Sequence, residues 1–314
     1  MNGLRAFGIL AGLTAAAIWG GMYVVSKVVL EYVSPFTLLT LRLVLGALAL
    51  GIVLLFRRGT LGPGKGRWTV VGVGVIGFGV SVGLQFVGTS LSSAAHAALI
   101  TSASPAFILL FGILLLGEPA TVPRVAALVV ATLGVIAVLN PGGAELGGGS
   151  LRGNLALLGA SVTWGLYSVL VKQVSRDRTT TEVSLLAFLG GLVVSLPMAA
   201  VEGSGLPAQT ATAPVLAGIL YLGLVSTALA MYLWNRSLAI LDAGLVSILF
   251  FAQPVVGVAL GALILGESLG ATFWLGAGLI ATGLVLSAVS SGARGRPRSS
   301  ELQRRPSDQG GQTS

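Results

Sequence analysis

The sequence predicts an all-α polytopic membrane protein in which ten transmembrane helices form two inverted five-helix repeats. Three observations predict this fold. Only 9% of the 314 residues are charged and 54% are hydrophobic, whereas an average soluble domain is about 25% charged. Ten apolar runs are long enough to cross a bilayer, and motifs of the first half recur in the second. This composition excludes an ordinary soluble enzyme, and it is also too apolar for a disordered chain.

The ten apolar runs define the predicted helices. Each holds about 20 residues, which a helix needs to cross the hydrocarbon core of a bilayer. The runs are apolar on all sides, as is typical of helices embedded in lipid. In chain order they cover residues 6–30, 34–55, 69–90, 94–116, 121–139, 153–172, 183–201, 214–235, 243–265 and 271–291.

A Gly-rich segment near the middle, residues 141–150, is the best linker in the chain. It divides the sequence into a first five-helix repeat, residues 1–142, and a second, residues 143–291. Residues 292–314 are rich in Arg, Ser, Gln and Gly. This composition predicts a disordered basic tail.

The basic residues predict the orientation of the chain. An even number of spans places both termini on one side of the membrane. If that side is the cytoplasm, 15 of the 18 Lys and Arg residues lie in cytoplasmic segments, and only Lys27 and Arg152 lie outside. Such a bias follows the positive-inside rule. The net charge of +8 is therefore a signal of topology, and we expect no nucleic-acid partner.

The internal repeat is visible in two pairs of segments. Residues 17–27 (AIWGGMYVVSK) match residues 162–172 (VTWGLYSVLVK), and residues 104–118 match residues 253–267. With five spans in each half, the two halves enter the membrane in opposite orientations. Inverted repeats are typical of secondary transporters, whose substrate site lies near the midplane between the repeats. The paired residues include Trp19/Trp164, Lys27/Lys172, Pro105/Pro254 and Glu118/Glu267.

These features together resemble the EamA-type transporters of the drug/metabolite transporter (DMT) superfamily. The resemblance rests on the Trp-Gly pair of the first span, Leu41-Arg42 of the second, and the Leu-Gly-Glu that ends the fourth and ninth. It covers residues 6–290 and implies secondary transport, most often export of amino acids, other metabolites or drugs across the bacterial inner membrane. It also implies a central cavity lined by spans 1, 3, 4, 6, 8 and 9. The second half has Ala187 where the first has Arg42, so any role of Arg42 is not symmetric.

Trp19 and Trp164 are candidates for the substrate site because they lie near the middle of their spans. Tryptophan usually collects at the membrane interface, and an indole N–H in hydrocarbon needs an acceptor. That acceptor could be cavity water, a substrate or a buried carbonyl, and packing between the halves is the alternative to a binding role. Tyr167 lies one turn after Trp164 on the same helical face.

The two prolines are expected to interrupt their helices near the midplane. Each would free backbone carbonyls beside polar residues, an arrangement that suits a polar or zwitterionic substrate. A fixed structural kink is the alternative. Gln85 and Tyr232 are further polar groups in apolar stretches. The predicted substrate-binding residues are Trp19, Gln85, Thr101, Ser104, Pro105, Trp164, Tyr167, Tyr232, Gln253 and Pro254.

Four ionisable residues near the spans have structural or coupling roles in this interpretation. Arg42 is expected to extend outward to the interface or to pair with Glu31, although an intramembrane charge can also be functional. Glu118 and Glu267 are expected to face the positively polarised start of the helix that follows each. His96, the only histidine, is a candidate proton carrier because its ordinary pKa lies near neutrality. An ordinary helix-end residue is the alternative for it.

The sequence thus favours a transporter that works by alternating access around a midplane cavity, and the resemblance implies that it exports small metabolites such as amino acids, or drugs. A channel or membrane scaffold is the main alternative. An intramembrane enzyme would need paired acids, a metal cluster or a Ser–His pair at depth, which the spans do not supply. The absence of cysteine excludes disulfides and thiolate metal sites. The expected partners are a small-molecule substrate and the lipid bilayer, without a cofactor, and the expected state is a monomer or homodimer.

Overall fold

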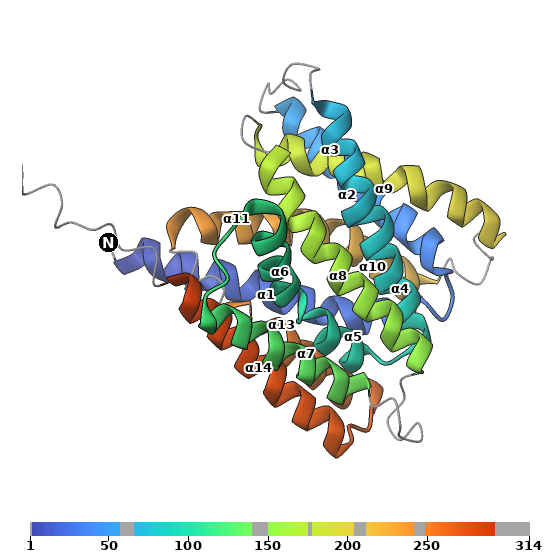
Figure 1. The fold of residues 1–314 in the computed structure, drawn as a ribbon. Coiled ribbons are helices and arrows are strands. Elements are labelled where there is room, and N and C mark those ends of the chain that lie inside the picture. The colour runs from blue at the N-terminus through green and yellow to red at the C-terminus, as the bar shows by residue number, and fades with distance from the viewer. Residues whose placement is uncertain are drawn as a thin grey trace, which may run out of the picture.

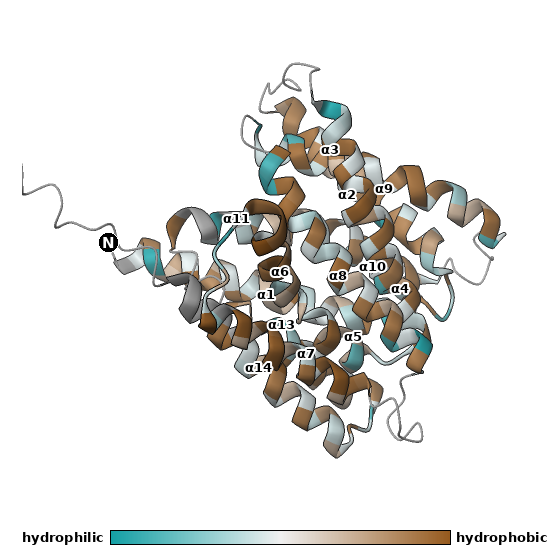
Figure 2. Cartoon of the chain, viewed as in Figure 1, coloured by the Kyte–Doolittle hydropathy of each residue, from teal (hydrophilic) through white to brown (hydrophobic). Residues whose placement is uncertain are grey.

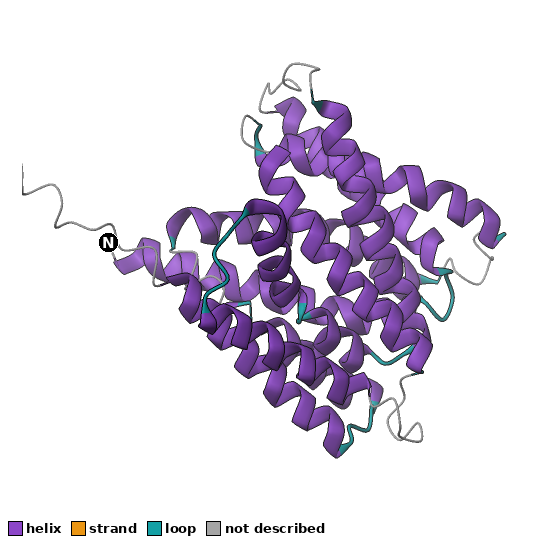
Figure 3. Ribbon diagram, in the orientation of Figure 1, coloured by secondary structure: helices purple, strands orange, loops and turns teal. Residues whose placement is uncertain are grey.

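The described part of the chain is helical, and no strand occurs in it (Figure 3). The predicted linker, up to residue 149, and the predicted tail, from residue 293, lie outside the described residues. The computed structural model describes residues 2–56, 66–139, 150–174, 178–203, 212–241, 249–250 and 252–292.

Helices occupy each of the ten apolar runs, and several runs contain more than one helical segment. The elements of the first half are α1 (Asn2–Val29), α2 (Pro35–Phe56), α3 (Arg67–Gly74), the π-helix η1 (Val75–Ser81), α4 (Val82–Leu91), α5 (Ala94–Thr101), α6 (Ser104–Leu116) and α7 (Val122–Leu139). Those of the second half are α8 (Leu151–Val174), α9 (Thr180–Glu202), α10 (Ala213–Leu220), the π-helix η3 (Tyr221–Leu229), α11 (Ala230–Ile240), α13 (Ala252–Leu265) and α14 (Ala271–Gly292).

Seven helical segments of the described chain are long and apolar enough to cross a membrane, and three further apolar helices are shorter. Hydrophobic residues predominate along most of the helices (Figure 2), and many large ones are exposed. Phe56, Leu263 and Val201, for example, are more than 80% exposed. In water such exposure would be unfavourable, whereas lipid tails accommodate it. The fold is therefore that of a polytopic membrane protein.

The main helix pairings cross between the two halves of the chain (Figure 1). Helix α2 packs against α9, and α7 packs against α14. Helix α1 contacts α11 and α13, while α8 contacts η1, α4 and α6. The buried core is consequently built from both halves together.

The sequence predicts that Pro105 and Pro254 interrupt their helices near the middle. The structure shows that they do not. The fourth run is divided at Ser102 and Ala103 into α5 and α6, and Pro105 lies in the first turn of α6. Pro254 lies in the first turn of α13. Proline fits there because the first N–H groups of a helix have no partner within the helix. The prolines therefore start helices instead of bending them.

Candidate functional site

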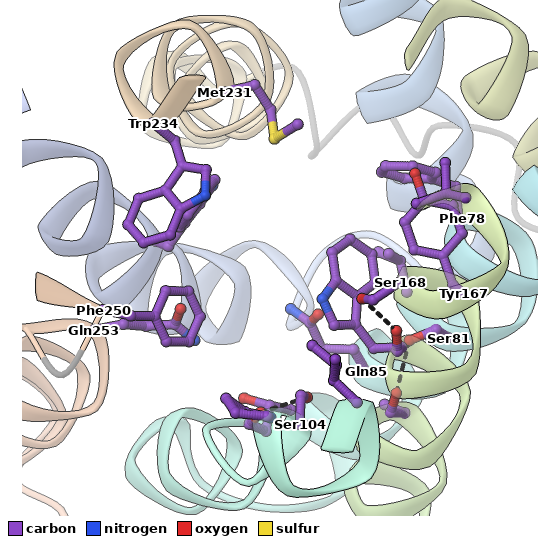
Figure 4. Close-up of a pocket in the computed structure, with 18 of the residues that line it drawn as sticks. Phe78, Ser81, Gln85, Ser104, Tyr167, Ser168, Met231, Trp234, Phe250 and Gln253 are labelled. Atoms are coloured by element: carbon purple, nitrogen blue, oxygen red, sulfur yellow. Dashed lines mark hydrogen bonds between the residues drawn. The ribbon is translucent and has the colours of Figure 1, made fainter. Parts of the chain in front are cut away.

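The principal cavity lies between the two halves and has a volume of about 630 Å³, within the usual range for small-molecule sites. Its walls come from α1, α2, η1, α4, α5 and α6 of the first half and from α8, α9, η3, α11 and α13 of the second. Figure 4 shows side chains from these helices converging on it. The cavity thus depends on both halves.

Eight of the ten predicted substrate-site residues line this cavity. The two others do not. Tyr232 is 51% exposed on α11, and Pro254 is buried in α13 and is not among the residues that line the cavity. The eight are Trp19, Gln85, Thr101, Ser104, Pro105, Trp164, Tyr167 and Gln253.

The first of two aromatic groups consists of Trp19, Trp234 and Phe250. Its ring centroids lie 5.4–6.1 Å apart. The Nε1–H of Trp19 donates a 2.9 Å hydrogen bond to the carbonyl of Ser226 in η3. The buried carbonyl, one of the acceptors considered from the sequence, therefore satisfies the indole of Trp19. The ring face remains in the cavity wall.

The second aromatic group consists of Phe78, Trp164, Tyr167 and Phe188. Phe78 makes edge-to-face contacts with the three others at centroid distances of 4.7–5.7 Å, and Trp164 lies 5.0 Å from Tyr167. The two groups lie on opposite sides of the cavity (Figure 4). A small apolar or aromatic group between them would contact rings on both sides.

A chain of hydrogen bonds joins α13, α1 and α5 at the cavity wall. The amide Nε2 of Gln253 donates to the hydroxyl of Tyr23 at 3.1 Å. That hydroxyl lies 2.5 Å from Oγ1 of Thr101, which donates to the carbonyl of Ala97 at 2.6 Å. Because Thr101 already donates to a carbonyl, Tyr23 is the donor to Thr101. Tyr23 is not among the site residues predicted from the sequence, although its hydroxyl is a polar group in an apolar run, as that of Tyr232 is.

Hydroxyl groups satisfy the carbonyls at the break between α5 and α6. Ser104 Oγ donates to the carbonyl of Thr101 at 2.7 Å. Ser161 Oγ, on α8, donates to the carbonyl of Ile100 at 2.9 Å. The break is thus stabilised by protein groups, as irregular backbone at membrane depth requires.

Arg42 neither extends outward nor pairs with Glu31, so the expectation for it is wrong. Its side chain is buried, with 7% exposure, and lines the cavity. Nε donates to Oγ1 of Thr227 at 2.9 Å, and the guanidinium carbon lies 5.7 Å from the ring centre of Phe86. Arg42 points inward because the neighbouring η3 provides a polar partner, Thr227.

Lys27 joins α1 to the end of α4 at one end of the molecule. Its Nζ donates to the carbonyls of Thr89, Ser90 and Ser92 at 3.2, 2.9 and 2.5 Å. These are carbonyls at a helix C-terminus, where a cation is favourable.

Glu267 lies at the same end and binds the start of α5. Its carboxylate accepts hydrogen bonds from the backbone N–H groups of Ala94 and Ala95 at 2.6 and 2.8 Å. The expectation that Glu267 faces the helix after it, α14, is therefore wrong. The carboxylate does bind a helix N-terminus, but that helix belongs to the other half.

Lys172 and Glu118 are the repeat counterparts of Lys27 and Glu267. Both line the cavity, and Lys172 Nζ lies 3.9 Å from Oε1 of Glu118. The side chain of Lys172 is 72% exposed and that of Glu118 is 31% exposed. The cavity therefore reaches the surface at the end of the molecule that holds this pair.

His96 lies at the start of α5 and does not line the cavity. Its Nδ1 lies 2.9 Å from Oγ of Ser93, and its ring contacts Phe273 edge-on at 5.0 Å. The geometry places His96 in packing between α5 and α14 and provides no direct contact with the cavity.

An all-helical membrane protein with a cavity between its halves has the architecture of a membrane transporter. The model of the EamA-like transporter family matches the chain twice, at residues 6–140 and 151–289. The chain belongs to this family.

Curated relatives carry transporter names. The permease-like protein YdzE of Bacillus subtilis is 51% identical over 67 residues, which are 21% of this chain and 86% of YdzE. A protein of Salmonella typhimurium named "Probable amino-acid metabolite efflux pump" is 27% identical over 293 residues, covering 90% of this chain and 95% of that protein. A solved structure titled "Crystal structure of protein" has 23% identity and a TM-score of 0.63 over 91% of this chain and 98% of that one. It shares the fold.

Proposed function

We propose that this protein is a secondary transporter that exports small metabolites from the bacterial cytoplasm by alternating access. The observation that carries the proposal is the cavity between the halves, which reaches the surface at the Lys172 and Glu118 end, while the hydrogen-bonded residues Lys27 and Glu267 do not line it. A carrier needs a site that opens to one side at a time.

In the proposed topology, ten transmembrane helices form two inverted repeats, residues 1–142 and 143–291, with both termini in the cytoplasm. The two family matches and the helices in all ten apolar runs support this arrangement. The distribution of basic residues supports the orientation. In it, the open end of the cavity faces the cytoplasm, as an exporter collecting its substrate requires.

The repeat suggests how the second state forms. In this arrangement Lys27 and Glu267 hold the outer end together through hydrogen bonds, whereas Lys172, the counterpart of Lys27, is 72% exposed at the other end. Inverted halves that exchange conformations also exchange the roles of equivalent residues. We therefore expect Lys172 and Glu118 to close the inner end when Lys27 and Glu267 release the outer end.

The proposed substrates are amino acids and related small metabolites, and the eight predicted residues that line the cavity form the proposed binding site. The cavity volume suits solutes of this size, and the aromatic groups suit solutes with an apolar part. The name of the Salmonella relative points in the same direction.

Counterflow in proteoliposomes tests the proposal. The purified protein is reconstituted into vesicles loaded with one unlabelled amino acid, and entry of the same labelled amino acid is followed across a panel of amino acids. A carrier accelerates labelled entry when unlabelled substrate is present inside, whereas a channel does not. If labelled entry were the same with and without internal substrate for every amino acid of the panel, the result would contradict the proposal. Rapid entry under both conditions would favour a channel.

A further inference from the structure

Two donors in the cavity wall have no protein partner. The Nη1 of Arg42 and the Nε2 of Gln85 are both buried, and neither donates to a group in the described part of the chain. Both residues line the principal cavity, Arg42 from α2 and Gln85 from α4. A buried donor without an acceptor is unfavourable, so the two atoms mark a place where an acceptor from outside the protein can bind.

The charge of Arg42 is also unpaired. Among the described residues that line the cavity, Glu118 is the only acid, and it lies beside Lys172 at the open end. The contacts of Arg42 are a neutral hydroxyl, Thr227, and the ring of Phe86. A buried cation surrounded by neutral groups is stabilised by an anionic ligand.

We propose that Arg42 and Gln85 bind the carboxylate of the transported solute, so that the cavity selects small organic acids and zwitterions. Guanidinium and carboxylate groups form strong charge-assisted hydrogen bonds, and an amide N–H adds a second donor. A single buried cation matches a single negative charge. The assignment rests on the proposed function, since it treats this cavity as the transport site.

The two aromatic groups of the cavity wall can contact the part of the solute that is not the carboxylate. The group formed by Trp19, Trp234 and Phe250 and the group formed by Phe78, Trp164, Tyr167 and Phe188 lie on opposite sides of the cavity. An apolar or aromatic side chain attached to the carboxylate would lie between these rings. The preferred solutes are therefore carboxylates with an apolar side chain.

Thr227 is a positioning residue for Arg42. Its Oγ1 accepts the hydrogen bond from Arg42 Nε and donates to the carbonyl of Leu222 at 2.8 Å. Thr227→Val removes both bonds at nearly constant volume, and Thr227→Ser retains the hydroxyl. We expect Thr227→Val to weaken carboxylate binding and Thr227→Ser to restore it, which a merely space-filling role would not produce.

Paired probes test the carboxylate site directly. Full-length protein in lipid nanodiscs is titrated with 3-phenylpropionate and with its neutral amide, 3-phenylpropanamide, and binding is followed by tryptophan fluorescence. L-phenylalanine and L-phenylalaninamide form a second pair. We expect each acid to bind roughly tenfold more tightly than its amide, because only the acid forms the charge-assisted bond. Equal affinities within both pairs, or no binding of either acid, would overturn the assignment.

Variants test which residues cause the preference for the acid over its amide. Arg42→Gln is expected to reduce the acid-to-amide ratio to about one, while Gln85→Leu reduces it partly. Arg152→Gln, an exposed arginine at the start of α8, is the matched control and should keep the full ratio. The amide measures whether each variant retains a folded cavity. If Arg42→Gln also lost amide binding, the test would rest on Gln85→Leu and Thr227→Val. An unchanged acid-to-amide affinity ratio in both of these variants would overturn the proposal.

Counterflow separates this inference from the proposed function. If the protein bound carboxylates but showed no counterflow, the proposed transport function would be wrong and the carboxylate-binding site would stand. If the Arg42→Gln variant still showed counterflow with an unchanged preference for acids, the assignment of the carboxylate site would be wrong and the transport function would stand.

Discussion

Trp19 combines a fixed position with an open ring face. Its indole N–H is anchored to the carbonyl of Ser226, while its ring joins Trp234 and Phe250 at the cavity wall. The hydrogen bond connects the first helix of one half to η3 of the other. Trp19 therefore contributes both to the shape of the cavity and to the contact between the halves.

Replacing Trp19 by Ala should reduce transport. The change removes a hydrogen bond and a ring that faces the solute, together about 1–2 kcal/mol, so the apparent affinity in counterflow should fall by roughly 5- to 30-fold. Trp274→Ala is the matched control because Trp274 is 57% exposed on α14, away from the cavity. Equal affinities of the two variants at matched expression would contradict the role of Trp19.

The sequence identifies the polar members of the site better than the apolar ones. Gln85 and Gln253 are conspicuous in apolar runs, and both line the cavity. Phe78 and Met231 also line it, but an apolar residue in an apolar run carries no signal. Arg42 was misread because its partner Thr227 lies 185 residues away, and no local pattern reveals that contact.

At the scale of elements, the π-helix η3 affects which residues of α11 face the cavity. A π-helical segment holds more residues per turn than an α-helix, so it rotates everything that follows. After η3, Met231 and Trp234 face the cavity, whereas Tyr232 is exposed. The sequence predicts that a helix exists here, but the local change of period is invisible in a uniformly apolar run.

Glycines set the distance between α3 and α9. A Cβ atom on Gly74 would overlap the backbone of Ala187, and one on Gly190 would overlap the carbonyl oxygen of Val71. Gly72, two residues before Gly74, has open space at its Cβ position. Small residues allow such close backbone contacts between membrane helices, so these glycines serve helix packing.

The pair Gly74→Ala and Gly72→Ala tests this packing. Gly74→Ala should lower stability by about 1–3 kcal/mol because the helices must separate, and Gly72→Ala should be neutral or slightly stabilising because alanine favours helix. Thermal unfolding of the purified variants, followed by tryptophan fluorescence, measures both. A melting temperature for Gly74→Ala at or above that of Gly72→Ala would show that the close contact is not required.

At the scale of the whole molecule, the duplicated motifs matter most. They predicted two related halves, and the family model does match twice. They could not predict that Glu267 binds the start of α5, because the main helix contacts cross between the halves. Local sequence specifies each helix, whereas the partner of each helix end depends on the assembled fold.

The asymmetry between the two ends of the molecule is the centre of the account. Lys27 and Glu267 make five hydrogen bonds to the α4–α5 corner, and at the other end the cavity reaches the surface beside Lys172, whose side chain is 72% exposed. Replacing both closing residues, with Lys27→Met and Glu267→Gln, should weaken closure of the outer end because charge-assisted bonds are lost.

Side-specific labelling of a single cysteine tests this account most directly. The chain has no cysteine, so Ser168→Cys, in the cavity wall, is unique. A membrane-impermeant maleimide should label it from the cytoplasmic face, and from the outer face only when Lys27→Met and Glu267→Gln are added. Arg152→Cys, on an exposed position, reports which face each vesicle preparation presents. Equal labelling from both faces in the otherwise unchanged protein, or from neither, would contradict an alternating-access cavity.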